Sequence, residues 1–389
     1  MDSGSKKDLA ALRLVNKKWS AVVATLLWRR FYVDLRDSPS FDALLKSSPD
    51  GILDNVKELV ITNVTVTRNS SQQHRKYSNL LKLFGVLPRD GLSSLESIRF
   101  KFDPALICVL MRCQSKLRKL DIIADESTFE YLPISCIRGN LLELEALWVD
   151  VFMGMRYTYE NMSTWFDFMP NLREMIVAGR WNAPVAVPNF FEGWALTTPL
   201  GLLKLHTLDM RQISLPSDPA PITAHLDFPS LRHLKFTHCT NTDPFLSSLT
   251  EAYVKTAGAP LETYCYSADV SPKDALLASA NLIELCTGLK YVQLTGITGS
   301  ILDLQCLGSS GRSLSKLALN SNMITRDPFY YSAEDLKEMA VLCPNLRILS
   351  ICLCDLASYV DDLDWTDPFR LTNNYSNDFY IDKLVSSTV

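Results

Sequence analysis

The stretch Leu231-Arg-His-Leu234-Lys-Phe236 is one copy of a six-residue pattern: an apolar residue, two free positions, a second apolar residue, one free position and a third apolar residue. The pattern recurs along nearly the whole chain, with its first residue at Val56, Leu95, Leu117, Leu144, Leu172, Leu205, Leu231, Leu261, Leu289, Leu314 and Leu346. Successive copies are 22 to 39 residues apart. Repetition of one short unit on this scale is the sequence signature of a solenoid, whose stacked repeats share a continuous core.

The segments between these copies show the apolar spacing of helices, for example at 104–113, 244–256 and 273–286. Pro170, Pro229 and Pro344 each precede the first leucine of a copy by two residues. Because the residue before a proline disfavours helical geometry, these prolines mark the place where a helix ends and a strand begins. The sequence therefore predicts an α/β solenoid in the form of a horseshoe, with parallel strands on the concave face and helices on the convex face.

The composition argues against several classes of function. The chain of 389 residues has a formal net charge of −4, whereas nucleic-acid-binding proteins usually carry a strongly basic face. No run of apolar residues approaches the length of about 18 that a transmembrane helix needs. Residues 1–10 lack the apolar segment of a signal peptide. We therefore expect a cytoplasmic and/or nuclear protein with no membrane or nucleic-acid partner.

The sequence contains no motif that predicts catalysis, a metal site or a cofactor. It has no Gly-x-Ser-x-Gly nucleophile elbow, no Walker loop and no Gly-x-Gly-x-x-Gly run. The segment Gly308-Ser-Ser-Gly311 lacks the lysine that would complete a phosphate loop, and the five histidines are scattered. The cysteines lack zinc-site spacing, and Cys113, Cys286 and Cys343 recur just before a first leucine, as small apolar residues of the core. The sequence thus predicts a protein that is not an enzyme.

The free positions of the pattern carry the residues that could recognise a partner. Side chains alternate along a strand, so the third and fifth positions and the residue after the pattern face away from the core. Aromatic and arginine side chains there are of the types enriched at binding hot spots. The residues predicted to bind a protein substrate on this face are Arg99, Lys119, Trp148, Asp150, Arg211, His233, Lys235 and Tyr291.

The N-terminal segment differs from the repeats. Residues 1–36 contain eight Lys and Arg against three Asp, which indicates a separate element. Apolar residues spaced by threes and fours predict a helix over 7–30, with a break near Ala24-Thr25, and alternation predicts a strand over 31–35. The polar run 68–76 predicts a loop, as do 180–203 and 214–221. The acidic tail after Cys354 is expected to cap the last repeat or to be partly loose.

This N-terminal segment resembles part of a known family. The run DLAALRLVNKKWSAVVATLLWRRFYVDL (8–35) is similar to the second half of an F-box, and the matching residues are Leu9, Leu12, Leu14, Val15, Trp19, Leu26, Leu27 and Trp28. The family's opening LPxEIxxxI segment has no counterpart, so we expect an N-terminally truncated or degenerate F-box. The segment Cys343–Ile351 resembles the "CPNLRxLxI" phrase in the leucine-rich repeats of F-box proteins. An F-box followed by irregular leucine-rich repeats is a common combination, notably in fungal proteins.

The resemblance implies an organisation and a function. It divides the chain into a partial F-box-like segment (1–36) and an irregular leucine-rich-repeat domain (37–389) of about eleven repeats with a capping tail. It implies the substrate-recognition subunit of a cullin–RING ubiquitin ligase, which binds a Skp-type adaptor, and through it a cullin, with its N-terminal helices. The residues implied on the adaptor side are Leu12, Val15, Trp19, Leu26, Leu27 and Trp28. The alternative is a leucine-rich-repeat scaffold that binds proteins without an adaptor and uses its N-terminal helix as a cap.

Overall fold

The computed structural model describes residues 17–35, 53–62, 70–124, 128, 131–152, 165–180, 202–255, 258–268, 273–297, 301–321, 331–351, 369–373 and 379–383. The chain divides into two compact units. The first comprises Met1–Ala183 and Glu192–Leu203, and the second comprises Pro184–Phe191 and Lys204–Val389.

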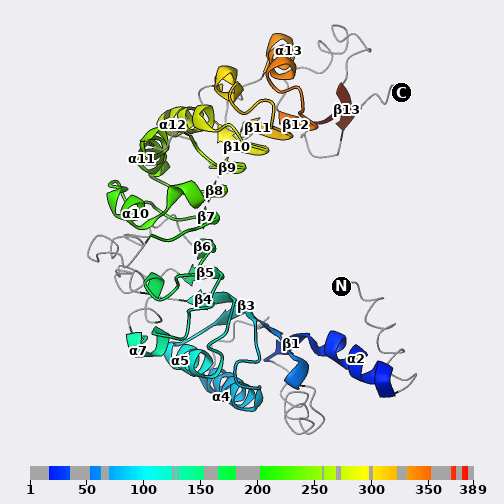
Figure 1. Ribbon diagram of the computed structural model, residues 1–389, viewed down its shortest axis with the longest axis vertical. Coiled ribbons are helices and arrows are strands. Elements are labelled where there is room, and N and C mark those ends of the chain that lie inside the picture. The colour runs from blue at the N-terminus through cyan, green and yellow to red at the C-terminus, as the bar shows by residue number, and fades with distance from the viewer. Residues whose placement is uncertain are drawn as a thin grey trace. The chain divides into compact units, whose positions relative to one another are not determined.

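The first unit is built from parallel strands that follow one another in chain order. The strands are β1 (Arg30–Asp34), β2 (Glu58–Thr62), β3 (Ser94–Lys101), β4 (Lys119–Ala124), β5 (Ala146–Phe152) and β6 (Glu174–Arg180). Each strand pairs in parallel with the next strand of the sequence. The helical elements are α2 (Lys17–Trp28), η2 (Leu53–Asn55), α4 (Ser70–Val86), α5 (Pro104–Cys113) and α7 (Ile134–Ile137). Helices α4, α5 and α7 lie on one side of the strands (Figure 1).

The second unit repeats this plan and ends differently. Its parallel strands, again paired in chain order, are β7 (Thr207–Arg211), β8 (His233–Thr237), β9 (Thr263–Ser267), β10 (Tyr291–Ile297), β11 (Lys316–Ser321) and β12 (Ile348–Ile351). The helical elements are α10 (Ala220–His225), η3 (Phe228–Ser230), α11 (Thr242–Lys255), α12 (Lys273–Leu285), η4 (Leu304–Leu307) and α13 (Ala333–Leu342). Strand β14 (Phe379–Lys383) then pairs antiparallel with β12, and β13 (Phe369–Asn373) pairs antiparallel with β14. The predicted α/β fold with parallel strands is confirmed, and the antiparallel pair in the tail was not predicted.

The apolar positions of the pattern form the core. Leu231, Leu234 and Phe236 expose 2%, 0% and 0% of their surface. Leu234 lies opposite Leu208 and Tyr264, so the second anchors of neighbouring copies stack across the sheet. The third anchors stack in the same way. Each copy therefore buries the same two side chains of its strand against its neighbours.

A shared backbone motif makes the strands begin at a common level. The carbonyl of His206 accepts hydrogen bonds from the N–H groups of Arg232 at 2.9 Å and His233 at 2.8 Å, both in the next copy. The same double acceptance occurs at Arg29, Lys57, Ser93, Arg118, Glu145, Arg232, Glu262, Lys290 and Ser315. These bonds fix the register of the repeats within each unit.

The register of β3 differs from the prediction. Leu95 pairs with Leu59 and Leu120, which are second anchors, so the first anchor of this copy is Leu92. The third anchor is then Ser97, which is buried and donates a hydrogen bond to the carbonyl of Phe100, whereas Ile98 is 39% exposed. The sequence misled because both 92–97 and 95–100 contain the leading pair of apolar residues, and only the second run has an apolar third position.

Two further predictions near the N-terminus were wrong. Residues 70–76 were predicted as a loop and instead form the first turns of α4. No break occurs at Ala24-Thr25, because α2 continues to Trp28. Helix α2 packs Val23, which is 1% exposed, inward. No helix in the part of the chain that the structure describes has both the length and the apolar character to cross a membrane.

Candidate recognition surface

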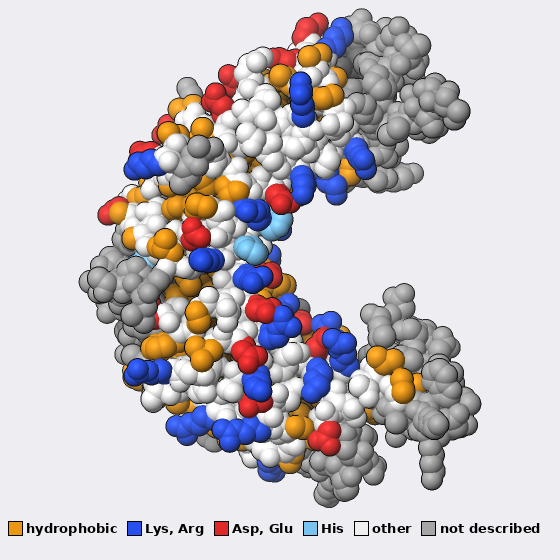
Figure 2. Space-filling view, in the orientation of Figure 1, with side chains coloured by type: hydrophobic (Ala, Val, Ile, Leu, Met, Phe, Trp, Pro, Cys, Tyr) orange, Lys and Arg blue, Asp and Glu red, His pale blue; other side chains and the backbone are white. Residues whose placement is uncertain are grey.

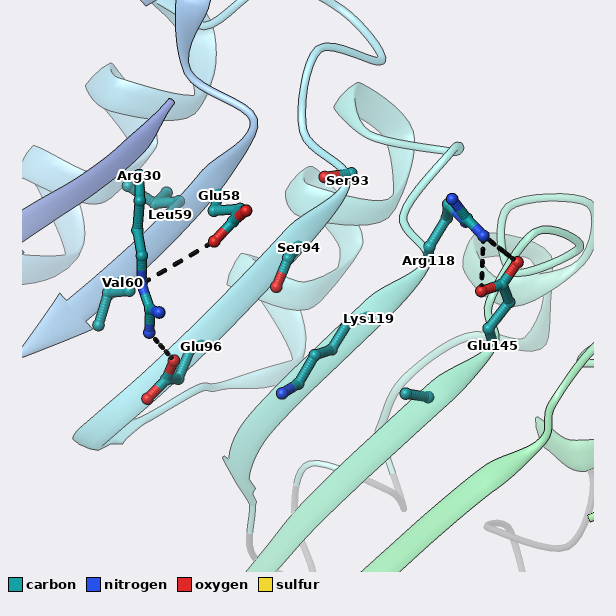
Figure 3. A pocket seen from close by; sticks show the side chains of 11 residues that line it. Arg30, Glu58, Leu59, Val60, Ser93, Ser94, Glu96, Arg118, Lys119 and Glu145 are labelled. Atoms are coloured by element: carbon teal, nitrogen blue, oxygen red, sulfur yellow. Dashed lines mark hydrogen bonds and ion pairs between the residues drawn. The ribbon is translucent and has the colours of Figure 1, made fainter. Parts of the chain in front are cut away.

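The outward face of the first unit holds a hollow of about 450 Å³ at the amino ends of β1 to β5 (Figure 3). Its lining consists of Arg30, Glu58, Leu59, Val60, Ser93, Ser94, Glu96, Arg118, Lys119, Glu145 and Ala146. Three cations and three carboxylates are among these residues, so the lining is electrically balanced. Polar side chains from five successive strands thus meet at one place because the register brings their first residues to one level.

Most of these charges are paired across strands. Arg30 lies between two carboxylates, with its Nη2 at 2.9 Å from Glu96 and its Nε at 3.9 Å from Glu58. Arg118 holds Glu145 through Nη2 at 2.6 and 2.8 Å from the two carboxylate oxygens (Figure 3). All of these side chains are partly exposed, and each such pair contributes only about 0–1 kcal/mol to stability. Their main effect is to hold the side chains in fixed positions.

Lys119 and Trp148, both predicted from the sequence, are brought together. The Lys119 ammonium lies 3.8 Å from the centroid of the Trp148 ring. The indole Nε1 of Trp148 donates to a carboxylate oxygen of Glu174 at 3.2 Å. Three adjacent strands, β4, β5 and β6, supply these side chains: Lys119 and Glu174 lie in register with Ala146, two residues before Trp148 on the strand between them. The half-buried indole is therefore oriented from two sides and presents the rest of its surface outward.

The structure describes the side chain of only one of the other two residues that were predicted in this unit, Asp150 and Arg99. Asp150 lies on β5 two residues beyond Trp148 and is half-buried. The backbone of Arg99 belongs to β3, and its side chain lies outside the described part of the structure.

The sequence reasoning missed the second position of the pattern. Arg118, Glu145, Glu262 and Lys290 each follow the first leucine of a copy, and each forms an ion pair at the amino edge of the strands. A charge or a polar residue at this position in every copy was the available signal. It was overlooked because strict alternation from the third position onward does not include it.

The second unit carries the other four predicted residues on its own strand face. His233 and Tyr291 lie at one register level, together with Thr207, Thr263 and Lys316. Lys235 lies two residues after His233 on β8. The Tyr291 hydroxyl donates to Gln293 at 2.5 Å. Arg211 donates two hydrogen bonds to the Asp209 carboxylate, from Nε at 3.0 Å and from Nη2 at 2.7 Å. Asp209 occupies the fifth position of its copy, which is predicted to face outward, but it is only 2% exposed, and Arg211 is bonded to its carboxylate.

His233 lies in an environment that disfavours its protonated form. Its pKa is lowered first by burial, and then by the nearby charges of Lys235, His206 and Lys290, against the opposing effect of Glu262. The pKa therefore lies below the ordinary 6.5, and the imidazole is neutral at pH 7. The carboxyl of Glu262 has a lowered pKa because Lys290 donates to it at 2.6 Å.

We expect Lys235→Ala to raise the pKa of His233. Removal of a neighbouring cation removes its repulsion of the imidazolium, and the smaller side chain also admits more solvent. Titration of the histidine ring signals by NMR measures the shift. Lys337→Ala, on α13, serves as the matched control and should leave the value unchanged. A His233 pKa that is the same with and without Lys235 would contradict the charge environment described here.

The buried cysteines have the properties of apolar core residues. Cys286 and Cys343 expose 0% and 1% of their surface, as predicted, whereas Cys113 is half-buried. Burial raises the pKa of the Cys286 thiol to about 12 and that of Cys343 to about 11. Thiols with such values are poor nucleophiles at neutral pH. Across the described ranges, no group of three or more His, Cys, Asp or Glu side chains is arranged to hold a metal ion.

The residues implied on the adaptor side lie in or near α2. Leu12 and Val15 are outside the described residues, and Trp19 is described only in its backbone. Leu26 is 44% exposed, whereas Leu27 and Trp28 are half-buried, with the Trp28 ring 6.2 Å from that of Phe31. Val22, which the sequence reasoning did not select, is 56% exposed and lies one helical turn before Leu26.

A scan of the sequence against models of protein families finds no match, and a search of curated proteins finds no matching sequence.

Proposed function

We propose that this protein is a leucine-rich-repeat solenoid that recognises another protein on the outward face of its strands. The cluster of Lys119, Trp148 and Glu174 is the observation that carries the proposal. A tryptophan held in place before binding loses little conformational freedom when a partner covers it. Tryptophan and arginine are also the residues that most often dominate binding energy at interfaces.

The order of the strands supports the same proposal. Consecutive parallel strands with buried anchors leave a regular array of outward side chains, such as His233 and Lys235 on β8. Recognition on such an array depends on the three-dimensional pattern of many side chains. This is the manner in which repeat proteins use an extended binding surface.

We further propose that the N-terminal segment joins the protein to a ubiquitin ligase as its substrate receptor. The resemblance of residues 8–35 to the second half of an F-box motivates this role. A cytoplasmic and/or nuclear location of the protein belongs to the same proposal. The exposed apolar pair Val22 and Leu26 on α2 supports it, because exposed apolar side chains on neighbouring turns suit a partner helix. A Skp-type adaptor would cover this pair, while the adjacent Val23, which is 1% exposed, packs α2 against its own unit.

The adaptor contact predicts a clear mutational effect. Val22→Asp with Leu26→Asp should reduce capture of the adaptor by the tagged protein by about tenfold or more, because buried charges in an interface cost well over 1.4 kcal/mol. Quantitative mass spectrometry of proteins captured from native lysate measures this. Val341→Asp is the matched control, since Val341 is an 80% exposed apolar residue on α13.

The outcomes separate the two parts of the proposal. Equal adaptor capture by wild type and the double variant would overturn the docking site on α2. Absence of the adaptor from the wild-type capture would overturn the ligase role and leave the alternative, a repeat protein that binds partners without an adaptor.

A further inference from the structure

The strand face of the second unit is positively charged although the chain as a whole is negative. We define this face by the outward positions of β7 to β12 and the residue that precedes each strand. It carries six cations, Arg211, Arg232, Lys235, Lys290, Lys316 and Arg347, against two carboxylates, Asp209 and Glu262, which leaves a net charge of +4. In Figure 2 blue Lys and Arg side chains gather along the strand edge of this unit, around two pale-blue histidines.

Both carboxylates of this face are already engaged. Asp209 is covered by Arg211 through two hydrogen bonds, and Glu262 lies 2.6 Å from the Lys290 ammonium. Lys235 and Lys316 form no ion pair with any residue that the structure describes. The same holds, within the described residues, for Arg232 and Arg347, and Arg232 donates only to the backbone carbonyls of Pro229 and Leu231. Four cations on this face therefore form no ion pair with any carboxylate in the described part of the chain.

The hollow of the first unit provides a contrast. There, cations and carboxylates are equal in number, and Arg30 and Arg118 are paired with carboxylates of neighbouring strands. The uncompensated charge is thus a property of the second unit and not a general feature of the repeat. Two lysines with open ammonium groups can pair with an incoming anion without first breaking an existing pair.

The spacing of the open lysines suits an extended acidic chain. Lys235 on β8 and Lys316 on β11 are separated by three strand spacings, about 14 Å at roughly 4.8 Å each, and by two residues along the strands, about 7 Å, which together give about 16 Å. An extended peptide advances about 3.4 Å per residue, so carboxylates about four to five residues apart would reach both ammonium groups. The side chains between them are the neutral Thr263, Cys265, Tyr291 and Gln293. Hydroxyl and amide groups there can bond to a peptide backbone without repelling a carboxylate.

We propose that the strand face of the second unit binds an acidic segment of a partner protein, with Lys235 and Lys316 as its principal anchors. The inference rests on the proposed function, since that segment belongs to the protein which the repeats recognise. A short acidic segment meets only the cationic face, whereas a nucleic acid is a long polyanion that would also meet the negatively charged remainder of the chain, whose overall formal net charge is −4.

The test uses the full-length chain and a fluorescein-labelled Glu-Ser-Gly-Ser repeat peptide, whose glutamates are four residues apart, with its Gln-Ser-Gly-Ser counterpart as the neutral probe. Fluorescence anisotropy at low ionic strength should show binding of the Glu peptide and none of the Gln peptide. Lys235→Glu with Lys316→Glu should weaken that binding by about tenfold or more. Lys255→Glu with Lys337→Glu makes the same change in net charge on α11 and α13, and should leave the affinity within about twofold.

Each other outcome overturns the inference. Absence of Glu-peptide binding, or equal loss in both double variants, would show that the strand face has no specific role. A labelled oligothymidylate that binds more tightly than the Glu peptide and depends on the same two lysines would replace the acidic segment by a nucleic acid. Adaptor capture through α2 does not involve these lysines, so failure here with capture intact leaves the ligase role standing. Far-UV circular dichroism of each variant verifies folding.

Discussion

Replacing Phe236 by alanine is expected to lower the free energy of unfolding by about 3–5 kcal/mol. The Phe236 ring is fully buried and packs edge-on against Phe245 of α11, with ring centroids 5.7 Å apart. It also stands in register between Met210 and Tyr266, the third anchors of the neighbouring strands. Truncation removes contacts both to the helix behind the strand and to the copies on either side, so the cavity has little freedom to close.

Urea unfolding followed by far-UV circular dichroism measures this effect. Lys235→Ala is the matched control, because Lys235 is the preceding residue and points to the other face of the same strand. Its free energy of unfolding should stay within about 0.5 kcal/mol of the wild-type value. Similar losses for both variants would mean that the alternation of core and surface along β8 is wrong.

The anchors of the pattern could be predicted because they depend on local chemistry alone. A strand that contacts a core on one face needs apolar side chains at alternate positions, and Leu234 and Phe236 satisfy this within a single stretch of the chain. Recurrence of the stretch then predicts parallel stacking, since each copy can bury its apolar face only against its neighbours. The burial of Cys286 and Cys343 follows from the same repetition.

The register of β3 could not be predicted because the local chemistry there is ambiguous. Two overlapping runs, from Leu92 and from Leu95, both place leucine or isoleucine three residues apart. The backbone decides between them: Ser93 and Ser94 donate to the carbonyl of Lys57 in the preceding copy. That choice depends on a strand about 36 residues earlier in the chain, and no property of the stretch itself reveals it.

Only part of the candidate site could be predicted, again because pairing between distant segments decides the rest. Lys119 and Trp148 were selected singly, each as an outward residue of its own strand. Their contact arises only when β4 and β5 pair in the observed register. The ion pair of Arg118 with Glu145 likewise joins residues 27 positions apart. Outward residues can therefore be predicted one strand at a time, whereas their partners require the stacked structure.

We expect Gly296 to be the glycine of the second unit whose replacement by alanine lowers the free energy of unfolding most. Gly296 has a φ of +81°, in the left-handed region, and lies where the pairing of β10 with β11 shifts between Thr295 and Ile297. A Cβ placed on it would overlap the backbone carbonyl of Ala268. Ala268 is held there by its own N–H, which donates to the carbonyl of Thr295 at 3.1 Å. A shift of the Ala268 backbone away from position 296 would therefore strain this hydrogen bond.

Gly296→Ala is accordingly expected to reduce the free energy of unfolding by about 2–5 kcal/mol, from about 1–2 kcal/mol of left-handed strain together with about 1–3 kcal/mol of overpacking. Urea unfolding again measures the loss. Gly288→Ala is the matched control from the same unit, because its nearest neighbour would be the carbonyl oxygen of Leu261 at an ordinary 3.8 Å. This control should change stability by less than about 1 kcal/mol. If the two variants unfold at the same urea concentration, neither the left-handed backbone at position 296 nor the close approach of Ala268 constrains this end of β10.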